Sequence, residues 1–383
     1  MMRARFLGYA LAAAIVAALP GPAFALPTMI RSGYTNCAAC HVAPQGGGPL
    51  NDYGRGIDQA QSLRGGEYQP ADDGLFRTLS VRGRVRQDVR LVMQQQGKWD
   101  GRSSINATRA RLMYRAVANI SDSVRFAGTV TGENESAARP KVSYEPPAAA
   151  SHVFVNTALV HYRAGTSVDI AAGRDQLPTG INIPDLGVFI KARNRLGYYD
   201  APTQLKAVLG GQRFQITPYM YAGGSNERRG ERERGAGSLA EFDLLGNQRT
   251  VLGMTVQRSS ATNGDRQLVG SYARLGFGRW GILAEHDVTT RRRGETLEGA
   301  FRQDATYAQV FWAARDWLVI STTGERLRVD VPYTEHLTAG KVEISSRLTS
   351  QATVIVGTRV ERNALNGRLS RSFAVQLALK TID

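Results

Sequence analysis

The chain has few cysteines, histidines and acidic residues, and each shortage limits what it can be. It has two cysteines and five histidines among 383 residues. Two thiols cannot make the disulfide network of a small secreted scaffold. The 33 Asp and Glu are outnumbered by 48 Lys and Arg, which gives a formal net charge of +15. Such a balance is typical of proteins that meet nucleic acid or an acidic membrane surface.

Long apolar runs are confined to the N-terminus, where residues 1–25 have the pattern of an export signal. Arg3 and Arg5 precede the apolar residues 6–19, and Ala23-Phe24-Ala25 forms a small-x-small cleavage site. A membrane-anchor helix is the alternative, but it needs roughly 20 apolar residues, and a Pro-Gly-Pro break ends this run. We therefore predict a cleaved signal peptide, a periplasmic, outer-membrane or secreted protein, and no nucleic acid as partner.

Both cysteines lie in Cys37-Ala38-Ala39-Cys40-His41. C-x-x-C-H is the attachment signature of c-type haem, in which two thiols bind the haem vinyl groups and the imidazole binds the iron. A thioredoxin-like pair would need a βαβ context, a zinc site would need a second ligand cluster, and a local disulfide would not require His41. We predict one covalent haem c, with Cys37 and Cys40 as attachment sites and His41 as proximal ligand.

The segment that carries this motif is short. Residues 26–73 number fewer than 50, and a chain of that size has too little core to cover a haem alone. We therefore expect another part of the protein to shelter the haem.

From residue 77 onward the hydrophobic pattern has period two. In residues 107–118, Leu112 and Tyr114 alternate with Arg111, Met113 and Arg115. Segments of about ten residues with alternating polarity are typical of membrane β-barrel strands, although a soluble β-sandwich or solenoid alternates too. We predict strands at 77–93, 107–118, 123–132, 151–163, 167–174, 203–209, 212–222, 248–258, 266–275, 279–290, 301–313, 317–328, 335–347, 351–361 and 370–380.

The connections favour the barrel because long and tight links alternate. The links 94–106, 133–150, 175–202 and 223–247 are long, as in barrels whose long loops all lie on the outer side. An added strand at 238–245 repairs the one break in this rhythm and makes the count even. We predict a transmembrane antiparallel β-barrel of about 16 strands over residues 74–383, with both termini on the periplasmic side.

The polar face of the first two strands would line the pore. It carries seven arginines, whose mutual repulsion calls for anionic compensation from haem propionates, acidic loops or anionic solutes: Arg82, Arg84, Arg86, Arg90, Arg109, Arg111 and Arg115. The face is interpreted equally well as an anion-selective porin wall or as a site for propionates or a docking cytochrome. The long link 176–203 either folds inward, as a constriction or haem cover, or extends outside.

The distal haem ligand is left open by the sequence. Met113 is the one methionine on the arginine-rich face of a clean strand, and thioether ligation is common in cytochromes c. His161 is the second candidate, and an open or solvent-bound iron is the third. Strand histidines are more often wall residues, and His286 and His336 have apolar neighbours that suggest the lipid side or the rim.

An export signal, one C-x-x-C-H motif and a barrel of about 16 strands together resemble the outer-membrane cytochrome–porin fusions, which include monohaem iron oxidases. The motif-level match covers residues 36–55. The resemblance implies electron transfer across the bacterial outer membrane through a single haem, from Fe(II) or another extracellular donor to a periplasmic cytochrome or other carrier. Gly46-Gly47-Gly48 departs from the iron oxidases, so a relative of other specificity fits equally well.

Two other classes stay open. The first is an anion-selective porin in which the haem segment is a plug or sensor, and the second is a soluble periplasmic β protein. Outer-membrane lipid and lipopolysaccharide are expected to surround a barrel, and basic loop clusters such as Arg291-Arg292-Arg293 would face solvent or lipopolysaccharide phosphates.

Overall fold

The computed structural model describes most of the chain from residue 85 onward. The described residues are 85–100, 104–134, 153–165, 167–183, 187–194, 196, 200–211, 213–223, 232–246, 249–261, 264–293, 300–330, 334–349 and 351–380. The predicted signal peptide and haem segment, residues 1–25 and 26–73, lie outside this part.

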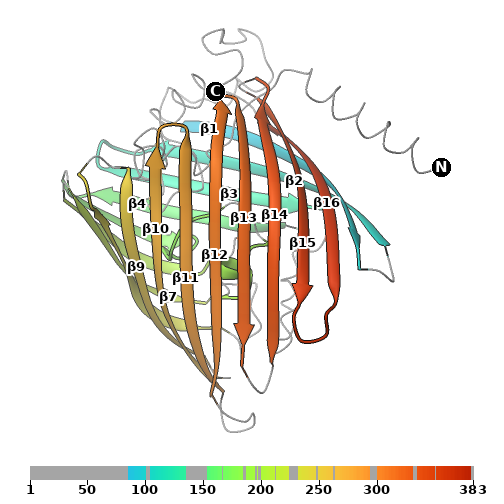
Figure 1. Cartoon of the computed structure of the whole chain (residues 1–383). Coiled ribbons are helices and arrows are strands. Elements are labelled where there is room, and N and C mark those ends of the chain that lie inside the picture. Colours follow the sequence, from blue (N-terminus) through green and yellow to red (C-terminus); the bar gives the residue numbers. More distant parts are fainter. Residues whose placement is uncertain are drawn as a thin grey trace.

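The described residues form a closed antiparallel barrel of sixteen strands, in which each strand pairs with its neighbours in sequence and β1 pairs with β16 (Figure 1). The strands are β1 Val85–Trp99, β2 Ser104–Asn119, β3 Val124–Glu133, β4 Val153–Arg163, β5 Val168–Arg174, β6 Thr203–Gly210, β7 Phe214–Ala222, β8 Arg234–Asp243, β9 Thr250–Ala261, β10 Gly264–Phe277, β11 Trp280–Arg293, β12 Ala300–Arg315, β13 Leu318–Val329, β14 Glu335–Arg347, β15 Ala352–Asn363 and β16 Leu369–Lys380. This confirms the predicted fold class, including the added strand, which is β8.

The two ends of the barrel differ in their connections. One end carries the turn between β2 and β3 and the six later turns of the same side, and we call it the short-turn end. Val85 and Lys380, the ends of the closed sheet, also lie there. The opposite end, the long-loop end, carries the long links between β3 and β4, β5 and β6, and β7 and β8. The predicted rhythm is not uniform, because the link between β9 and β10 at this end spans only residues 262–263.

The predicted long link at 94–106 is wrong. β1 continues to Trp99, and residues 100–103 alone connect it to β2. The three glutamines 94–96 look like a polar loop, but Gln94 and Gln96 face inward, where polar side chains belong. Their backbone pairs with β2 on one side and β16 on the other.

The outward face of the strands is apolar, which contradicts the soluble alternative. Large apolar side chains are exposed on strand after strand, among them Leu112, Val160, Met254 and Val310. Aromatic residues gather on this face within a few residues of the short turns, as in the aromatic girdles of transmembrane barrels: Phe126, Tyr162, Phe214, Phe242, Trp280 and Trp312. Trp280 and Trp312 stack there with ring centroids 5.9 Å apart. The outer surface is therefore built for a lipid environment.

Candidate functional site: the lumen and its inward segment

The inward face of the barrel is polar and densely filled. It carries buried hydroxyl and amide side chains on many strands, including Thr129, Thr131, Asn156, Gln257, Ser259, Gln303, Ser321 and Thr323. These alternate with the exposed apolar residues of the outward face. The alternation that predicts the strands therefore also predicts which side chains line the lumen.

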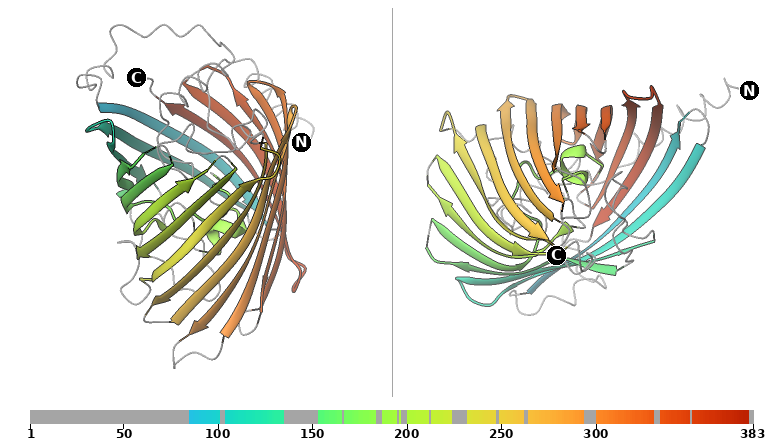
Figure 2. Two further views of the ribbon diagram at one scale, coloured as in Figure 1. Left: turned by 90° about the vertical axis from the view of Figure 1, so that its left-hand side faces the viewer. Right: turned by 90° about the horizontal axis from the view of Figure 1, so that it is seen from below.

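The segment between β5 and β6 folds into the barrel. Figure 2 shows its one described helix, α3 Phe189–Ala192, inside the ring of strands. The Ile181 N–H donates to Glu285 Oε2 on β11 at 2.7 Å, and the Phe189 N–H donates to Glu325 Oε2 on β13, also at 2.7 Å. Of the two predicted placements for this link, the structure has the inward one.

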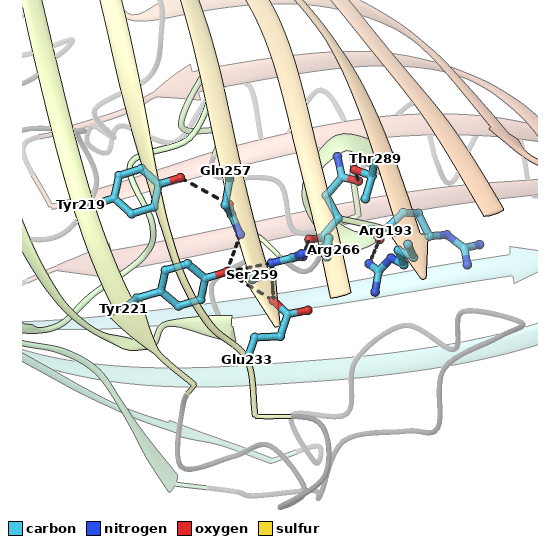
Figure 3. Close-up of polar contacts among 10 residues, drawn as sticks. Arg193, Tyr219, Tyr221, Glu233, Gln257, Ser259, Arg266 and Thr289 are labelled. Atoms are coloured by element: carbon cyan, nitrogen blue, oxygen red, sulfur yellow. Dashed lines mark hydrogen bonds and ion pairs between the residues drawn. The ribbon is translucent and has the colours of Figure 1, made fainter. Parts of the chain in front are cut away.

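Asn194 fixes the end of this segment to the barrel wall. Its side chain is fully buried, and its Nδ2 donates to Asp287 Oδ2 at 2.8 Å. Its Oδ1 accepts from Thr289 Oγ1 at 2.8 Å and from Gln303 Nε2 at 2.6 Å. Its carbonyl accepts from Arg266. Four polar groups on β10, β11 and β12 therefore converge on this one residue, and two of the four side chains, Arg266 and Thr289, are labelled in Figure 3.

Two cations and an apolar patch add to the attachment. The Lys191 ammonium donates to the Thr179 carbonyl at 2.9 Å and lies 3.5 Å from Glu285 Oε1. Arg193 forms an ion pair with Glu335 at 3.3 Å. Ile190 is fully buried in a cluster with apolar side chains of the wall, among them Leu283, Tyr307 and Phe311. The segment therefore packs firmly against the inner wall of the barrel and narrows the lumen.

A second polar cluster lies on β7 to β10 (Figure 3). Arg266 forms an ion pair with Glu233 at 2.5 Å. Gln257 Nε2 donates to the Tyr221 hydroxyl at 2.5 Å, and the Tyr219 hydroxyl donates to Gln257 Oε1 at 3.4 Å. Leu177 and Leu196 of the inward segment share an apolar cluster with both tyrosine rings. These aromatic side chains therefore support the segment and are themselves covered.

The arginine-rich wall of β1 and β2 has carboxylates of its own. Arg111 forms an ion pair with Glu133, and Arg115 forms one with Asp88 at 2.8 Å. Arg90 and Arg109 lie on the same face, opposite Met113 and Gln94 respectively. Arg82 and Arg84 lie outside the described residues, as does the side chain of Arg86. Part of the expected anionic compensation thus comes from Asp88 on β1 itself and from Glu133 on the adjacent β3.

The haem-attachment residues Cys37, Cys40 and His41 lie outside the described residues. Both distal-ligand candidates lie on the lumen face, where Met113 is 7% exposed and His161 is 5% exposed. The Nε2 atom of His161 is buried with no hydrogen-bond partner, which is costly for a ring nitrogen. His286 and His336 are on the outward face, in agreement with their apolar neighbours, and His286 Nδ1 lies 2.9 Å from Thr306 Oγ1.

A buried ion pair adjoins His161 and was not predicted. Lys206 Nζ lies 2.8 Å from Asp175 Oδ2, and the Lys206 side chain is fully buried. Lys206 and His161 are both paired with Ala171, so the three residues form a row across β4, β5 and β6. Lys206 lies on β6 at a position whose side chain points inward. The alternation of inward and outward residues along this strand could therefore have predicted that Lys206 lies in the lumen.

Within the described part of the chain, no three His, Cys, Asp or Glu side chains are grouped as a metal site. No helix in that part is long and apolar enough to cross a membrane.

Solved structures with the same fold are outer-membrane barrels, at low sequence identity. OmpT of Vibrio cholerae is 11% identical, with a TM-score of 0.54 over 78% of this chain and 97% of that one. OprB of Pseudomonas putida at high pH is 9% identical, with a TM-score of 0.58 over 78% and 94%. The anion-selective porin from Comamonas acidovorans is 11% identical, with a TM-score of 0.54 over 78% and 99%. No family model matches the chain, and no curated protein matches it.

Proposed function

We propose that the chain forms a pore of the bacterial outer membrane that favours anions. The observation that carries this proposal is the lumen face of β1 and β2. Among the described residues, four arginines lie there on two adjacent strands, Arg90, Arg109, Arg111 and Arg115, and two of their ion pairs are Arg111 with Glu133 and Arg115 with Asp88. One solved structure with the same fold is the anion-selective porin from Comamonas acidovorans.

The narrowing of the lumen makes this charge effective. Charges that line a narrow passage with low-dielectric walls concentrate ions of opposite sign. The inward segment, held at Glu285 and Glu325 on the far wall, brings permeating solutes closer to the arginine-bearing strands.

Ion selectivity in planar bilayers tests the pore. Under a KCl gradient, the reversal potential of the full protein should show a preference for chloride. Arg90→Gln with Arg109→Gln should lower that preference, because it removes two lumen charges and leaves the ion pairs of Arg111 and Arg115 intact. The matched control is Arg258→Gln with Arg371→Gln, which removes two charges from the outward face. Cation selectivity of the unmodified protein would contradict the proposal.

We propose, as a second function, that residues 26–73 carry one c-type haem that works with this barrel. The supporting observation is Cys37-Ala38-Ala39-Cys40-His41, together with the entry of the chain into the barrel at Val85, at the short-turn end. Cys37 and Cys40 would hold the group, and His41 would bind its iron. When bound, it would supply one-electron transfer between an external donor such as Fe(II) and a periplasmic carrier.

The lumen wall also carries side chains that could bind the distal side of a haem iron. The wall presents a thioether at Met113 and an orphaned imidazole nitrogen at His161, which are the two side-chain types that most often complete haem coordination. Met113 and His161 are therefore the residues of the wall that we assign as candidates for the distal side.

A reduced-minus-oxidised spectrum of the purified protein tests the haem separately from the pore. We expect a c-type haem band that survives denaturation of the protein and disappears in the double variant Cys37→Ala with Cys40→Ala. Only one of the single variants Met113→Leu and His161→Gln should change this band, because one side chain binds the distal side of the iron. A missing band would refute the haem and leave the pore intact. A band that exchanges no electrons with Fe(II) or a periplasmic cytochrome would instead favour a haem segment that acts as a plug or sensor.

A further inference from the structure

The outward faces of several strands are apolar near the short-turn end and carry arginines toward the long-loop end. On β12, Trp312 and Val310 face outward near the short turns, whereas Arg302 faces outward toward the long-loop end. The same change occurs on β9, β13, β15 and β16, and it leaves a set of exposed outward arginines near the long-loop end: Arg258, Arg302, Arg326, Arg328, Arg362 and Arg371.

These arginines lie at the depth of the outer membrane interface. Arg326 lies eight residues beyond Leu318, and Arg362 lies ten residues beyond Ala352. A strand that rises about 3.3 Å per residue with a tilt of about 40° places them roughly 20–25 Å from the short-turn end. The apolar band of such barrels is about 25 Å tall, and an arginine at its midplane costs about 2–4 kcal/mol. The arginines therefore lie where lipid headgroups begin.

Strand register gathers two of them around one hydroxyl. β12, β13, β14 and β15 lie side by side at the front of Figure 1. Arg326 on β13 is paired with Thr338 on β14, and Thr338 is paired with Arg362 on β15. All three side chains are exposed and share the outward face. With strands about 4.8 Å apart, two long guanidinium side chains flank the Thr338 hydroxyl at a spacing that lets both reach a single bound group.

Charge pairing separates these two arginines from their neighbours. Arg302 forms an ion pair with Asp304 at 2.9 Å, and Arg328 forms one with Asp330 at 3.1 Å. Among the described residues, Arg326 and Arg362 have no carboxylate partner. Their charge is therefore available to an anionic ligand.

We propose that Arg326, Thr338 and Arg362, which we call the arginine patch, bind a phosphate group of a phosphorylated glycolipid in the outer leaflet. Guanidinium groups bind phosphate oxygens through paired hydrogen bonds, and a hydroxyl donates one more. The patch continues toward the short turns into exposed apolar side chains, Val342, Ile344 and Val360, which offer a surface to acyl chains. Charge for the headgroup and an apolar surface for the chains together indicate a lipid, and not a free anion.

The patch is local to one side of the barrel. The outward positions toward the long-loop end of β3, β4, β6 and β7 carry exposed Val130, Val153, Leu205 and Met220. A lipid that required phosphate contacts would therefore find them on β12 to β15 and not on those strands.

Binding of a defined lipid tests the proposal. The full protein in phosphatidylcholine nanodiscs is titrated with lipid A bearing two phosphates, or with the same lipid after dephosphorylation, and bound lipid is counted by native mass spectrometry. Arg326→Gln with Arg362→Gln is compared with Arg279→Gln and Arg315→Gln, two exposed arginines at the short-turn end. Inorganic phosphate and chloride at equal ionic strength are added as competitors.

The proposal predicts about a tenfold or greater loss of bound lipid A in the patch variant and less than a twofold change in the control. Dephosphorylated lipid A should bind the unmodified protein as weakly as the phosphorylated lipid binds the variant. Equal binding of lipid A to the variant and the unmodified protein would overturn the proposal. Specific displacement by inorganic phosphate would also overturn it, because the patch would then be a site for a free anion. Neither result depends on whether the pore is anion-selective or carries haem.

Discussion

Replacing Asn194 by aspartate should release the end of the inward segment from the barrel wall. The substitution keeps the size and shape of the side chain and keeps the oxygen that accepts from Thr289 and Gln303. It changes only the group that faces Asp287. In the unmodified protein that group is the Asn194 amide, whose Nδ2 donates to Asp287 Oδ2 at 2.8 Å. In the variant recorded at high pH, where both groups are ionised and share no proton, two carboxylate oxygens would face each other at that distance.

The size of the effect follows from this geometry. A hydrogen bond to a charged acceptor contributes about 1.5–3 kcal/mol. Two like charges about 3–4 Å apart repel by roughly 4–5 kcal/mol at an effective dielectric constant of about 20. Allowing for partial relaxation, we expect a cost of about 4 kcal/mol. At about 1.4 kcal/mol for each factor of ten, the balance between attached and released states would shift by roughly a thousandfold.

Single-channel recording measures this shift, because a released segment no longer narrows the lumen. Asn194→Asp should show a larger conductance, or frequent transitions to a larger one, than the unmodified protein. The matched control is Asn134→Asp at the rim, where the same change removes a bond to the Thr108 carbonyl. Adding Asp287→Asn to Asn194→Asp restores a donor and an acceptor at this contact, so conductance should return toward its original value.

An unchanged conductance in Asn194→Asp would refute the reasoning. It would mean that the contacts at Glu285, Glu325 and Glu335 hold the segment without Asn194. A rise that Asp287→Asn fails to reverse would also refute it, since the cause would then not be the contact between these two side chains.

Two further predictions concern the stability of the barrel, measured by denaturant unfolding in detergent. Gly253→Ala would place a methyl group into the ring of Tyr272, so we expect the free energy of unfolding to fall by about 1–3 kcal/mol. The control is Gly324→Ala, which should change stability little because the added carbon meets open space. Lys206→Met should lower the free energy of unfolding by about 3–5 kcal/mol because it leaves Asp175 buried without its cation. Adding Asp175→Asn to Lys206→Met should recover part of that loss. A double variant as unstable as the single one would show that the ion pair is not the cause.

The strands could be predicted because barrel sequences alternate. The pattern at residues 107–118 predicts a strand that the structure extends to Ser104–Asn119. The parity of Arg109, Arg111 and Arg115 places them in the lumen, and the structure bears this out. The prediction fails at the end of β1, because glutamines suit a polar loop and a lumen wall equally well. Composition alone cannot separate these two environments.

The contacts of the inward segment could not be predicted in the same way. Asn194 binds Asp287 and Gln303, which are about 100 residues away in sequence. No local spacing connects them, and they meet only because β11 and β12 present their inward faces where the segment crosses. The length of the link at 176–203 was enough to suggest an inward constriction as one placement, but its attachment points depend on closure of the whole barrel.

Pairing of β1 with β16 also constrains the order in which the molecule can be assembled. Gln94 lies beside Gln376 only after every intervening strand has been made. Joining such distant segments has a modest entropic cost, because that cost rises only by about 0.6 kcal/mol per doubling of loop length, but it is slow. Until it happens, the sheet has two unpaired edges that invite association with other chains. The wall that holds the inward segment is complete only once β1 pairs with β16, so the lumen takes its final form at that last pairing step and not strand by strand.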